Sequence, residues 1–429
     1  MLKITKTEPT SIVKDFDVFV SYLENNNVIA TKTQRFISRK HLLELNNLMT
    51  RPETDVKSHY NQDHYPLLHL FYCISMAGKL FYLSSGKGNK LYFTPSERIK
   101  EYKILNDTEK YFALLQILWI DTNWEDLQIL NNFRISSLIE QMDIILKEFV
   151  EILPNNRTLF YNDSTKYIFL SLSSLILYLS YFGIWTIERL RDDDIPELNR
   201  YFIPKSISLT DFGVQIVKVL AKLSLKDWNK VSPKDYFHNS FIDFLASFST
   251  GSSLIDIKEN MKENTKTKKI NKQFIEYFTH LFEPGKLQRS LGEVEQKHNP
   301  GNYIFKVSLN KGVWRKIKLS SNHTLEDLHL MIQKAFDFDN DHMYAFYMDM
   351  KPFSDNAYNC PESDKGPYTD EAVIGDIEIF TKQEFMYLFD FGDQWIFSVK
   401  LEEILENEKE ITEPIIIDRK GESPEQYPY

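Results

Sequence analysis

The chain has 429 residues, of which 42% are hydrophobic and 26% are charged. These fractions are close to those of average globular proteins and exclude a largely disordered or fibrous chain. The two cysteines, Cys73 and Cys360, exclude a disulfide framework, and no group of Cys and His has the spacing of a zinc site. We therefore expect a reducing, cytoplasmic location.

The negative charge is concentrated at the C-terminal end of the chain. Residues 301–429 contain 13 Lys and Arg against 25 Asp and Glu, a net charge of −12, whereas the whole chain carries −10 and the part before residue 301 carries +2. Non-specific affinity for nucleic acids comes from Lys and Arg that neutralise phosphates. Any contact with nucleic acid is therefore expected before residue 301.

Residues 1–126 are predicted to form a winged-helix-like domain. Apolar residues at helical spacing indicate two helices between residues 16 and 48. Pro66 marks the first turn of a third helix, which ends at Gly78. Two apolar runs, 80–83 and 91–94, flank a glycine-rich loop and predict a hairpin. Three helices followed by a two-stranded wing are typical of winged-helix domains.

A related pattern predicts a second helical, winged-helix-like domain over residues 127–225. An apolar stripe from Ile135 to Phe149 is typical of a helix that faces a core. Residues 167–187 contain no charge and are long enough to span a membrane, but their serines and glycine favour a buried helix followed by a strand. We therefore expect no membrane association. The run SISLTDFGVQIV (206–217) resembles the last strand and following helix of winged-helix domains.

Residues 226–298 are predicted to form a helical connector that contains a polar linker, residues 258–272. The linker carries six Lys against two Glu and few apolar residues, which is typical of a solvated loop.

DNA binding is the function that a winged helix suggests, and it requires a third helix that presents polar or basic side chains to base edges. The predicted third helix, residues 66–77, contains no Lys or Arg, and the second predicted wing, residues 191–197, is acidic. Lys87, Lys90 and Arg98 around the first wing are the candidates for phosphate contacts. These features favour a structural or protein-contacting role over direct DNA reading.

Residues 299–429 are predicted to form a third folded domain, because the apolar period changes to two near Asn302. The expected elements are a hairpin over 303–319, a helix that begins with a capping box at Thr324 and Asp327, a strand over 342–348, a polar loop over 351–369 and a hairpin over 385–401. This order predicts an α/β roll that is β-grasp-like. The whole chain is accordingly expected to be α+β, with a mostly helical N-terminal region and a C-terminal α/β roll.

Several motifs of this C-terminal domain resemble the plasmid pRiA4b ORF-3-like family, also described as passenger TnpR-like. They include DLH (Asp327–His329), HMYAF (342–346), DFGDQW (Asp390–Trp395) and GESPEQYP (421–428). The resemblance implies an α/β-roll protein of largely undefined activity, found in bacteria and on mobile elements. Two features depart from the family. Phe397 replaces a histidine that is common after the hairpin tryptophan, and the ending lacks the family's glycines.

His329, His342, Asp390 and Asp393 are the candidates for chemistry in this domain. Two imidazoles and two carboxylates can hold a divalent metal or exchange protons. Their spacing matches no metal-site motif, so the structural alternatives are a core histidine at His329 and turn roles for the other three. Arg315 is expected to pair with one of the acids, and Trp395 is expected to face the core. These six residues form our candidate binding cluster.

The sequence favours an uncharacterised, non-catalytic binding protein associated with bacterial mobile elements. Its acidic C-terminal domain would contact a protein, or DNA held in a larger complex, and we expect no cofactor and no bound metal. Two alternatives stay open, namely direct DNA binding through the N-terminal region and a metal-dependent enzyme that uses the two histidines and two aspartates. The chain lacks the common phosphate-loop, dinucleotide, metalloprotease and serine-hydrolase motifs.

Overall fold

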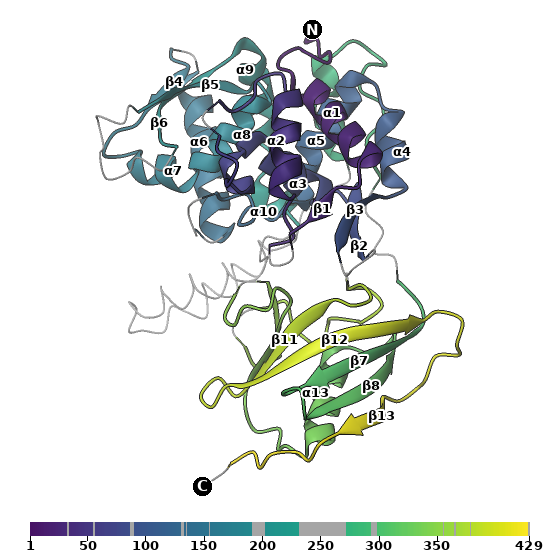
Figure 1. Ribbon diagram of the computed structural model, residues 1–429. Coiled ribbons are helices and arrows are strands. Elements are labelled where there is room, and N and C mark those ends of the chain that lie inside the picture. Colours follow the sequence, from purple (N-terminus) through teal and green to yellow (C-terminus); the bar gives the residue numbers. More distant parts are fainter. Residues whose placement is uncertain are drawn as a thin grey trace, which may run out of the picture. The chain divides into compact units, whose positions relative to one another are not determined.

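The computed structural model of the chain describes residues 1–31, 34–54, 56–85, 90–129, 133, 135–153, 155–190, 202–230, 272–292, 298–354, 356–363, 366–377 and 379–427. The chain divides into two compact units. Unit 1 comprises residues 1–28, 36–82 and 93–292, and unit 2 comprises residues 29–35, 83–92 and 293–429. Helices dominate the N-terminal region and a seven-stranded sheet dominates the C-terminal part, which confirms the α+β class (Figure 1).

The first helical block has the order helix, strand, helix, helix, strand, strand. Its elements are α1 (Ile12–Asn25), β1 (Ile29–Ala30), α2 (Arg39–Leu48), α3 (Pro66–Ala77), β2 (Phe81–Ser85) and β3 (Leu91–Pro95). The strands pair in the order β1–β3–β2. Pro66 lies in the first turn of α3 and Gly78 at its C-cap, as predicted. Ser38 lies at the N-cap of α2 but makes no side-chain capping bond.

The second helical block repeats this order of elements and strands. Its elements are α6 (Ile135–Ile152), β4 (Thr158–Phe160), α7 (Lys166–Ser171), α8 (Ser173–Tyr181), β5 (Trp185–Arg189) and β6 (Pro204–Leu209), and its sheet has the order β4–β6–β5. The charge-free run 167–187 therefore forms helices that lead into a strand, as predicted. No helix in the described part of the chain is long and apolar enough to cross a membrane.

Further helices follow each block. The chain continues through α4 (Arg98–Lys103), α5 (Asp107–Gln116) and η2 (Ile117–Asp121) after the first block, and through α9 (Asp211–Leu220) and α10 (Leu225–Trp228) after the second. Two short turns, η4 (Phe274–Tyr277) and η5 (Thr279–Leu281), precede unit 2 in the sequence. Much of the predicted connector, including linker residues 258–271, lies outside the described residues.

The described residues of unit 2 that follow residue 298 form one helix and seven strands, and these strands make a single sheet. The elements are β7 (Asn302–Ser308), β8 (Trp314–Ser320), α13 (Leu325–Phe336), β9 (Tyr344–Tyr347), β10 (Ala357–Asn359), β11 (Glu384–Phe389), β12 (Trp395–Leu405) and β13 (Ile415–Lys420). The sheet order is β10–β9–β11–β12–β7–β8–β13, and every neighbouring pair is antiparallel. The sequence did not predict β10, which lies in the expected loop 351–369, or β13.

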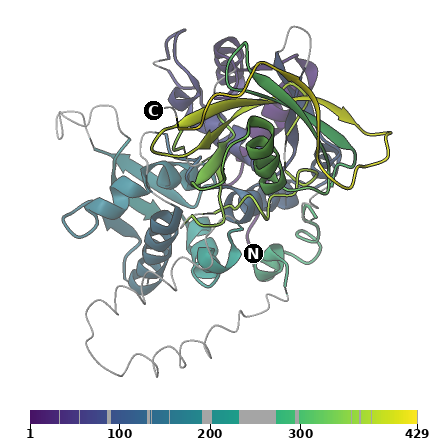
Figure 2. The same cartoon turned by 90° about the horizontal axis from the view of Figure 1, so that it is seen from below.

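The core of unit 2 lies between the sheet and α13, which rests on one face of the sheet (Figure 2). Alternate residues of β7, namely Tyr303, Phe305 and Val307, point into this core. The predicted capping box starts the helix, because the Thr324 hydroxyl accepts from the Asp327 N–H and the Asp327 carboxylate accepts from the Thr324 N–H. These contacts fix where α13 begins and therefore where its C-terminal end and the following loop lie.

Candidate functional site

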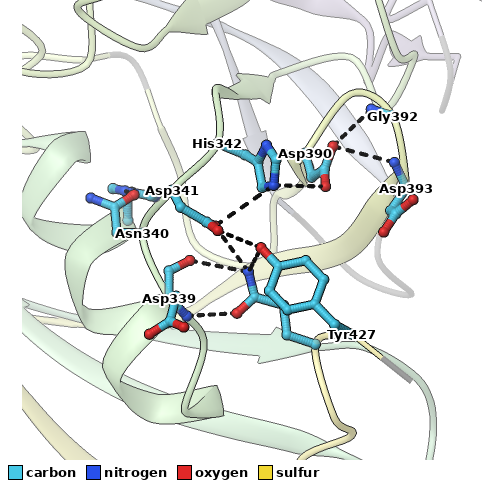
Figure 3. Close-up of polar contacts among 10 residues, drawn as sticks. Asp339, Asn340, Asp341, His342, Asp390, Gly392, Asp393 and Tyr427 are labelled. Atoms are coloured by element: carbon cyan, nitrogen blue, oxygen red, sulfur yellow. Dashed lines mark hydrogen bonds and ion pairs between the residues drawn. The ribbon is translucent and has the colours of Figure 1, made fainter. Parts of the chain in front are cut away.

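Three segments of unit 2 come together beside the end of α13 (Figure 3). They are the connection from α13 to β9 (337–343), the turn from β11 to β12 (390–394) and residues 426–427. We call the side chains that meet here the His342 cluster, which consists of Asp341, His342, Asp390, Gln426 and Tyr427.

His342 lies between two carboxylates in this cluster (Figure 3). Its Nε2 is 3.4 Å from Asp390 Oδ2 and 3.8 Å from Asp341 Oδ1. The His342 side chain is 41% exposed, whereas the Asp390 side chain is 10% exposed. The imidazole is thus open to solvent on one side and faces negative charge on the other.

Asp390 also holds the turn between β11 and β12. Its backbone has a φ of 56°, in the left-handed region that Asp tolerates better than most residues. Its Oδ1 accepts the backbone N–H groups of Gly392 and Asp393, at 2.8 and 3.3 Å. One carboxylate oxygen therefore closes the turn, as predicted for this residue, and the other faces His342. The Asp393 side chain is exposed and points away from His342 (Figure 3).

The C-terminal residues Gln426 and Tyr427 attach to the loop after α13. Gln426 Oε1 accepts from the Asp339 N–H at 2.6 Å, while its Nε2 donates to Asp339 O and to Asp341 Oδ1. The Tyr427 hydroxyl donates to Asp341 Oδ2 at 2.5 Å. This hydrogen bond lowers the pKa of Asp341 and raises the pKa of Tyr427 to about 12. Asp341 is therefore held as a carboxylate beside His342.

His329 lies in the core beneath this loop rather than in the His342 cluster. The residue is 1% exposed, and its ring stacks on Tyr344 with the ring centres 3.5 Å apart. Its two nitrogens contact the Tyr387 hydroxyl at 2.7 Å and Asn340 Oδ1 at 2.9 Å. Burial lowers the pKa of His329 to about 4. The prediction of a hydrogen-bonded core histidine is confirmed.

Arg315 is a buried structural residue whose hydrogen bonds go to oxygens other than those of the expected acids. Its Nε donates to Ala335 O at 2.8 Å, in the last turn of α13, and its Nη2 donates to Ser423 Oγ at 2.7 Å. Its Nη1 donates to backbone carbonyls of Trp314, Lys420 and Gly421. The guanidinium also lies over the Phe336 ring. These contacts contradict the expectation that Arg315 pairs with one of the acids.

Trp395 is half-buried and packs edge-on against Phe338, with ring centres 4.8 Å apart. Its Nε1 finds no hydrogen-bond partner in the part of the chain that the structure describes. The residue joins the partly buried margin of the core, which agrees with the expected inward orientation.

The candidate nucleic-acid contacts do not gather into one site. Lys87 and the predicted acidic wing 191–197 lie outside the described residues, and Lys90 is exposed. Arg98 is half-buried and donates to Gly292 O at 2.9 Å. Neither α3 nor α8 contains an exposed residue. The helices that would have to enter a DNA groove are therefore packed inside unit 1, as their sequences indicated.

The His342 cluster provides one solvent-accessible imidazole next to negative charge. Such an arrangement can bind a cationic group or exchange protons with solvent. Among the described residues, no group of three or more His, Cys, Asp and Glu side chains is arranged to hold a metal ion. The sequence identified His342 and Asp390, but it did not single out Asp341, Gln426 and Tyr427 as partners. The only signal for the last two was the GESPEQYP motif.

Two comparisons with known proteins match part of the chain. The crystal structure of a protein of unknown function, MM3350 from Methanosarcina mazei Go1, is similar, with 32% identity over 30% of this chain and 74% of that chain and a TM-score of 0.25. A search of the curated proteins found no match. The family model described as plasmid pRiA4b ORF-3-like protein matches residues 302–426. The chain thus carries a plasmid pRiA4b ORF-3-like region at the place that its motifs predicted.

Proposed function

We propose that this chain is a non-catalytic, cytoplasmic binding protein whose unit 2 binds a protein partner through a basic segment of that partner. The observation that carries the proposal is that His329 and Arg315 of unit 2 are taken up by hydrogen bonds inside the fold. Both ring nitrogens of His329 and the guanidinium of Arg315 are engaged inside the fold. Acidic groups outnumber basic ones in residues 301–429, which carry a net charge of −12.

The proposed contact is the exposed surface around the His342 cluster. Asp339, Asp341 and Asp393 are exposed there. Met343 is 41% exposed and Ile396 40% exposed, on the strands and loops of the same end. Carboxylates attract a basic partner over a distance, and neighbouring apolar side chains add contact area once it docks. The net charge of −12 on residues 301–429 favours the same kind of partner.

Affinity capture with the tagged full-length chain tests this proposal. The variant D339N/D341N/D393N removes three charges from the proposed surface. The matched control E403Q/E406Q/E413Q removes three exposed charges from the opposite end of β12 and the loop that follows it. We expect a protein that the wild type and the control retain at low salt and that the first variant loses. Equal recovery of every captured protein by all three chains, or no captured protein at all, would contradict the proposal.

Direct DNA binding is the second candidate, and one observation favours it. The two helical blocks share one order of elements and one sheet order, and the sequence predicted both as winged-helix-like. The absence of exposed residues on α3 and α8 weakens this candidate, because base readout needs a helix that enters the groove. A gel-shift series over salt with the full chain separates the two functions. We expect no shift even at low salt, where phosphate-driven affinity is strongest.

A metal-dependent enzyme is the third candidate function, and elemental analysis tests it. Elemental analysis of the purified chain, with H342A as the comparison, would reveal a stoichiometric divalent ion if that reading were right. We also propose an association with mobile elements, which the family resemblance of the sequence motifs implies. The genes that neighbour this one in its genome would test that association.

A further inference from the structure

Unit 1 contains a cavity of about 460 Å³ between its first and second helical blocks. Its walls come from the segment before α1, the loop after α2, the start of α3, the end of α8 and the last residue of β5. The volume lies within the range of small-molecule sites, roughly 300–1,000 Å³. The cavity lies in a different unit from the His342 cluster and is independent of the function proposed above.

Two tyrosines in the cavity wall carry hydroxyls with no internal partner. Tyr65 is only 2% exposed, yet its hydroxyl makes no hydrogen bond within the described part of the chain, and the same holds for the Tyr181 hydroxyl. Burial raises the pKa of both phenols, so they stay protonated and can donate. Neither hydroxyl oxygen is among the fully buried polar atoms that lack a partner, so both hydroxyls are open to the cavity. A ligand atom that accepts from Tyr65 would take the place of a water molecule there.

Charged groups converge at the same cavity. Arg51 and Arg189 are exposed residues that both line it, and the Arg189 guanidinium lies over the Phe202 ring, 4.6 Å from its centre. Glu53 also lines it, and burial raises the pKa of this carboxyl while Arg189 opposes the rise. Glu53 and Arg189 both act on the pKa of Tyr181, which places the three groups at one end. The Asp15 carboxylate also lines the cavity but accepts hydrogen bonds from Ser11 and Thr50, so Glu53 is the carboxylate that remains beside the two guanidinium groups.

The loop that carries Arg51 and Glu53 is held in place before any ligand arrives. Buried Asp15 accepts from the backbone N–H and the hydroxyl of Thr50, at 2.9 and 2.6 Å. The side-chain amide of Asn46 makes two bonds with the backbone of Glu53, both at 2.9 Å. Residues 50 and 53 are thus clamped on either side of Arg51. A preformed wall of this kind lowers the entropic cost of binding.

The opposite wall is fixed by contacts between the N-terminal segment and the end of α8. The Thr10 hydroxyl donates to Tyr181 O at 2.5 Å. Gly183 has a φ of +74°, and a Cβ at this position would lie 3.0 Å from atoms of Pro9 and Thr10. The close approach therefore requires glycine. It keeps the N-terminal segment against the cavity.

Apolar side chains also line the cavity, between polar residues of the N-terminal segment and the loop after α2. Ile12, Met49, Leu68 and Leu177 are each buried and line the cavity. We propose that this cavity binds a small amphipathic organic anion. Its anionic group pairs with Arg51 and Arg189, a polar atom accepts from Tyr65, and its apolar body lies against the four aliphatic side chains. Guanidinium groups suit carboxylate, sulfonate and phosphate oxygens, which they can bind through two N–H groups.

Fluorescence titration of the full-length chain with 1-anilinonaphthalene-8-sulfonate tests the proposal, because this probe combines an aromatic body with one anionic group. We expect saturable binding to the wild type. Y65F removes a single hydroxyl and R51Q a single charge, and each should weaken binding about three- to tenfold. E53Q removes the opposing charge and should tighten binding about twofold. None of the three changes the packing of the core, and circular dichroism would verify that each variant folds.

R157Q is the matched control for charge. Arg157 is exposed in unit 1, pairs with Asp211 and lies outside the cavity lining. We expect R157Q to bind the probe like the wild type. Unchanged affinity in both Y65F and R51Q would overturn the proposal. An equal loss in R157Q and R51Q would also overturn it, since the attraction would then come from general charge rather than from the cavity.

Discussion

The imidazole of His329 lies where only its neutral form satisfies the surrounding groups. Asn340 Oδ1 can only accept, so His329 Nε2 carries the hydrogen. The Tyr387 hydroxyl accepts from Gln333 Nε2 at 2.6 Å and therefore gives its own hydrogen to His329 Nδ1. A proton on His329 Nδ1 would point at the hydroxyl hydrogen of Tyr387, and this contact would be unfavourable. Burial is the largest influence and lowers the pKa of this ring, whereas the hydrogen bond to Asn340 opposes it.

This arrangement predicts a loss of stability in mild acid. The pKa of His329 is lowered from 6.5 to about 4 in the folded chain, so the unfolded chain binds the proton more tightly. The contribution of this group is fully present above pH 6.5 and is lost as the pH falls from about 6.5 towards 4. We expect the free energy of unfolding of unit 2 to fall by about 2–3 kcal/mol between pH 7 and pH 4.5. Urea titrations at pH 7 and pH 4.5 would measure this change in the free energy of unfolding.

The control for this prediction is a pair of histidine variants. H329Q removes the titrating ring and should flatten the pH dependence in that window, whereas H342Q removes an exposed ring and should leave the dependence in place. His69 in unit 1 is also buried with a lowered pKa. It is present in every variant, so its contribution cancels in the comparison. If the free energy of unfolding of H329Q depended on pH as steeply as that of the wild type, the pH dependence would not come from His329.

Some residue-level features could be predicted from the sequence and others could not. His329 occurs on the apolar side of an amphipathic helix, and that local pattern was enough to predict its burial. The partners of Asp341 were not predictable, because Gln426 and Tyr427 lie more than 80 residues away and reach it only after the last strand has formed. The acceptors of Arg315 depend on the same return of the chain.

Arg315 joins three elements of unit 2, namely β8, the end of α13 and the segment after β13. A cation is favoured at the C-terminal end of a helix, where carbonyl groups lack partners. R315K keeps the charge but cannot reach all these acceptors with one ammonium group. We expect R315K to destabilise unit 2 by about 3 kcal/mol, measured by urea unfolding. R419K makes the same change at an exposed position of β13 and should cost about 0.5 kcal/mol or less.

The contact between α9 and the chain before β5 depends on Gly213. A Cβ at this position would lie 1.6 Å from the carbonyl oxygen of Ile184. Backbone cannot yield as a flexible side chain does, so G213A must push the helix away from β5. We expect a loss of about 3 kcal/mol or more in the stability of unit 1.

Gly292 provides the matched control for that substitution, because a Cβ there would meet no atom within 4 Å. G292A should leave the thermal midpoint of unit 1 within about a degree of the wild type. Similar midpoints for G213A and G292A would mean that the close approach at Gly213 carries no packing energy.

The elements that the sequence did not predict are those without a one-sided burial pattern. All six residues of β13 are exposed, so its apolar residues Ile415–Ile417 show no alternation. β1 has two residues and β10 has three, too few for any period to be visible. By contrast, β7 and β8 each bury alternate residues, and the sequence predicted both. Edge strands held by backbone pairing leave the weakest sequence signal.

At the scale of the whole molecule, the repeated order of elements in the two helical blocks was foreseeable, whereas the packing of one block on the other was not. The run SISLTDFGVQIV indicated the second block because it combines a strand, the N-cap Thr210 and a helix in twelve residues. The cavity between the blocks depends on contacts such as Thr10 with Tyr181, which are 171 residues apart. Local patterns therefore predicted the blocks but not the space that they enclose.

Among the described residues, the main hydrophobic core of unit 2 contains none from the N-terminal region. Every member of its main hydrophobic cluster lies between Tyr303 and Ile404, although unit 2 also includes residues 29–35 and 83–92. We therefore expect a fragment of residues 298–429 to fold alone and to unfold cooperatively in urea. Its amide spectrum should be well dispersed, and R315K should cost the fragment the same free energy as it costs the full chain. A collapsed spectrum, or a fragment that folds only when residues 29–35 and 83–92 are supplied, would show that the core depends on the N-terminal region.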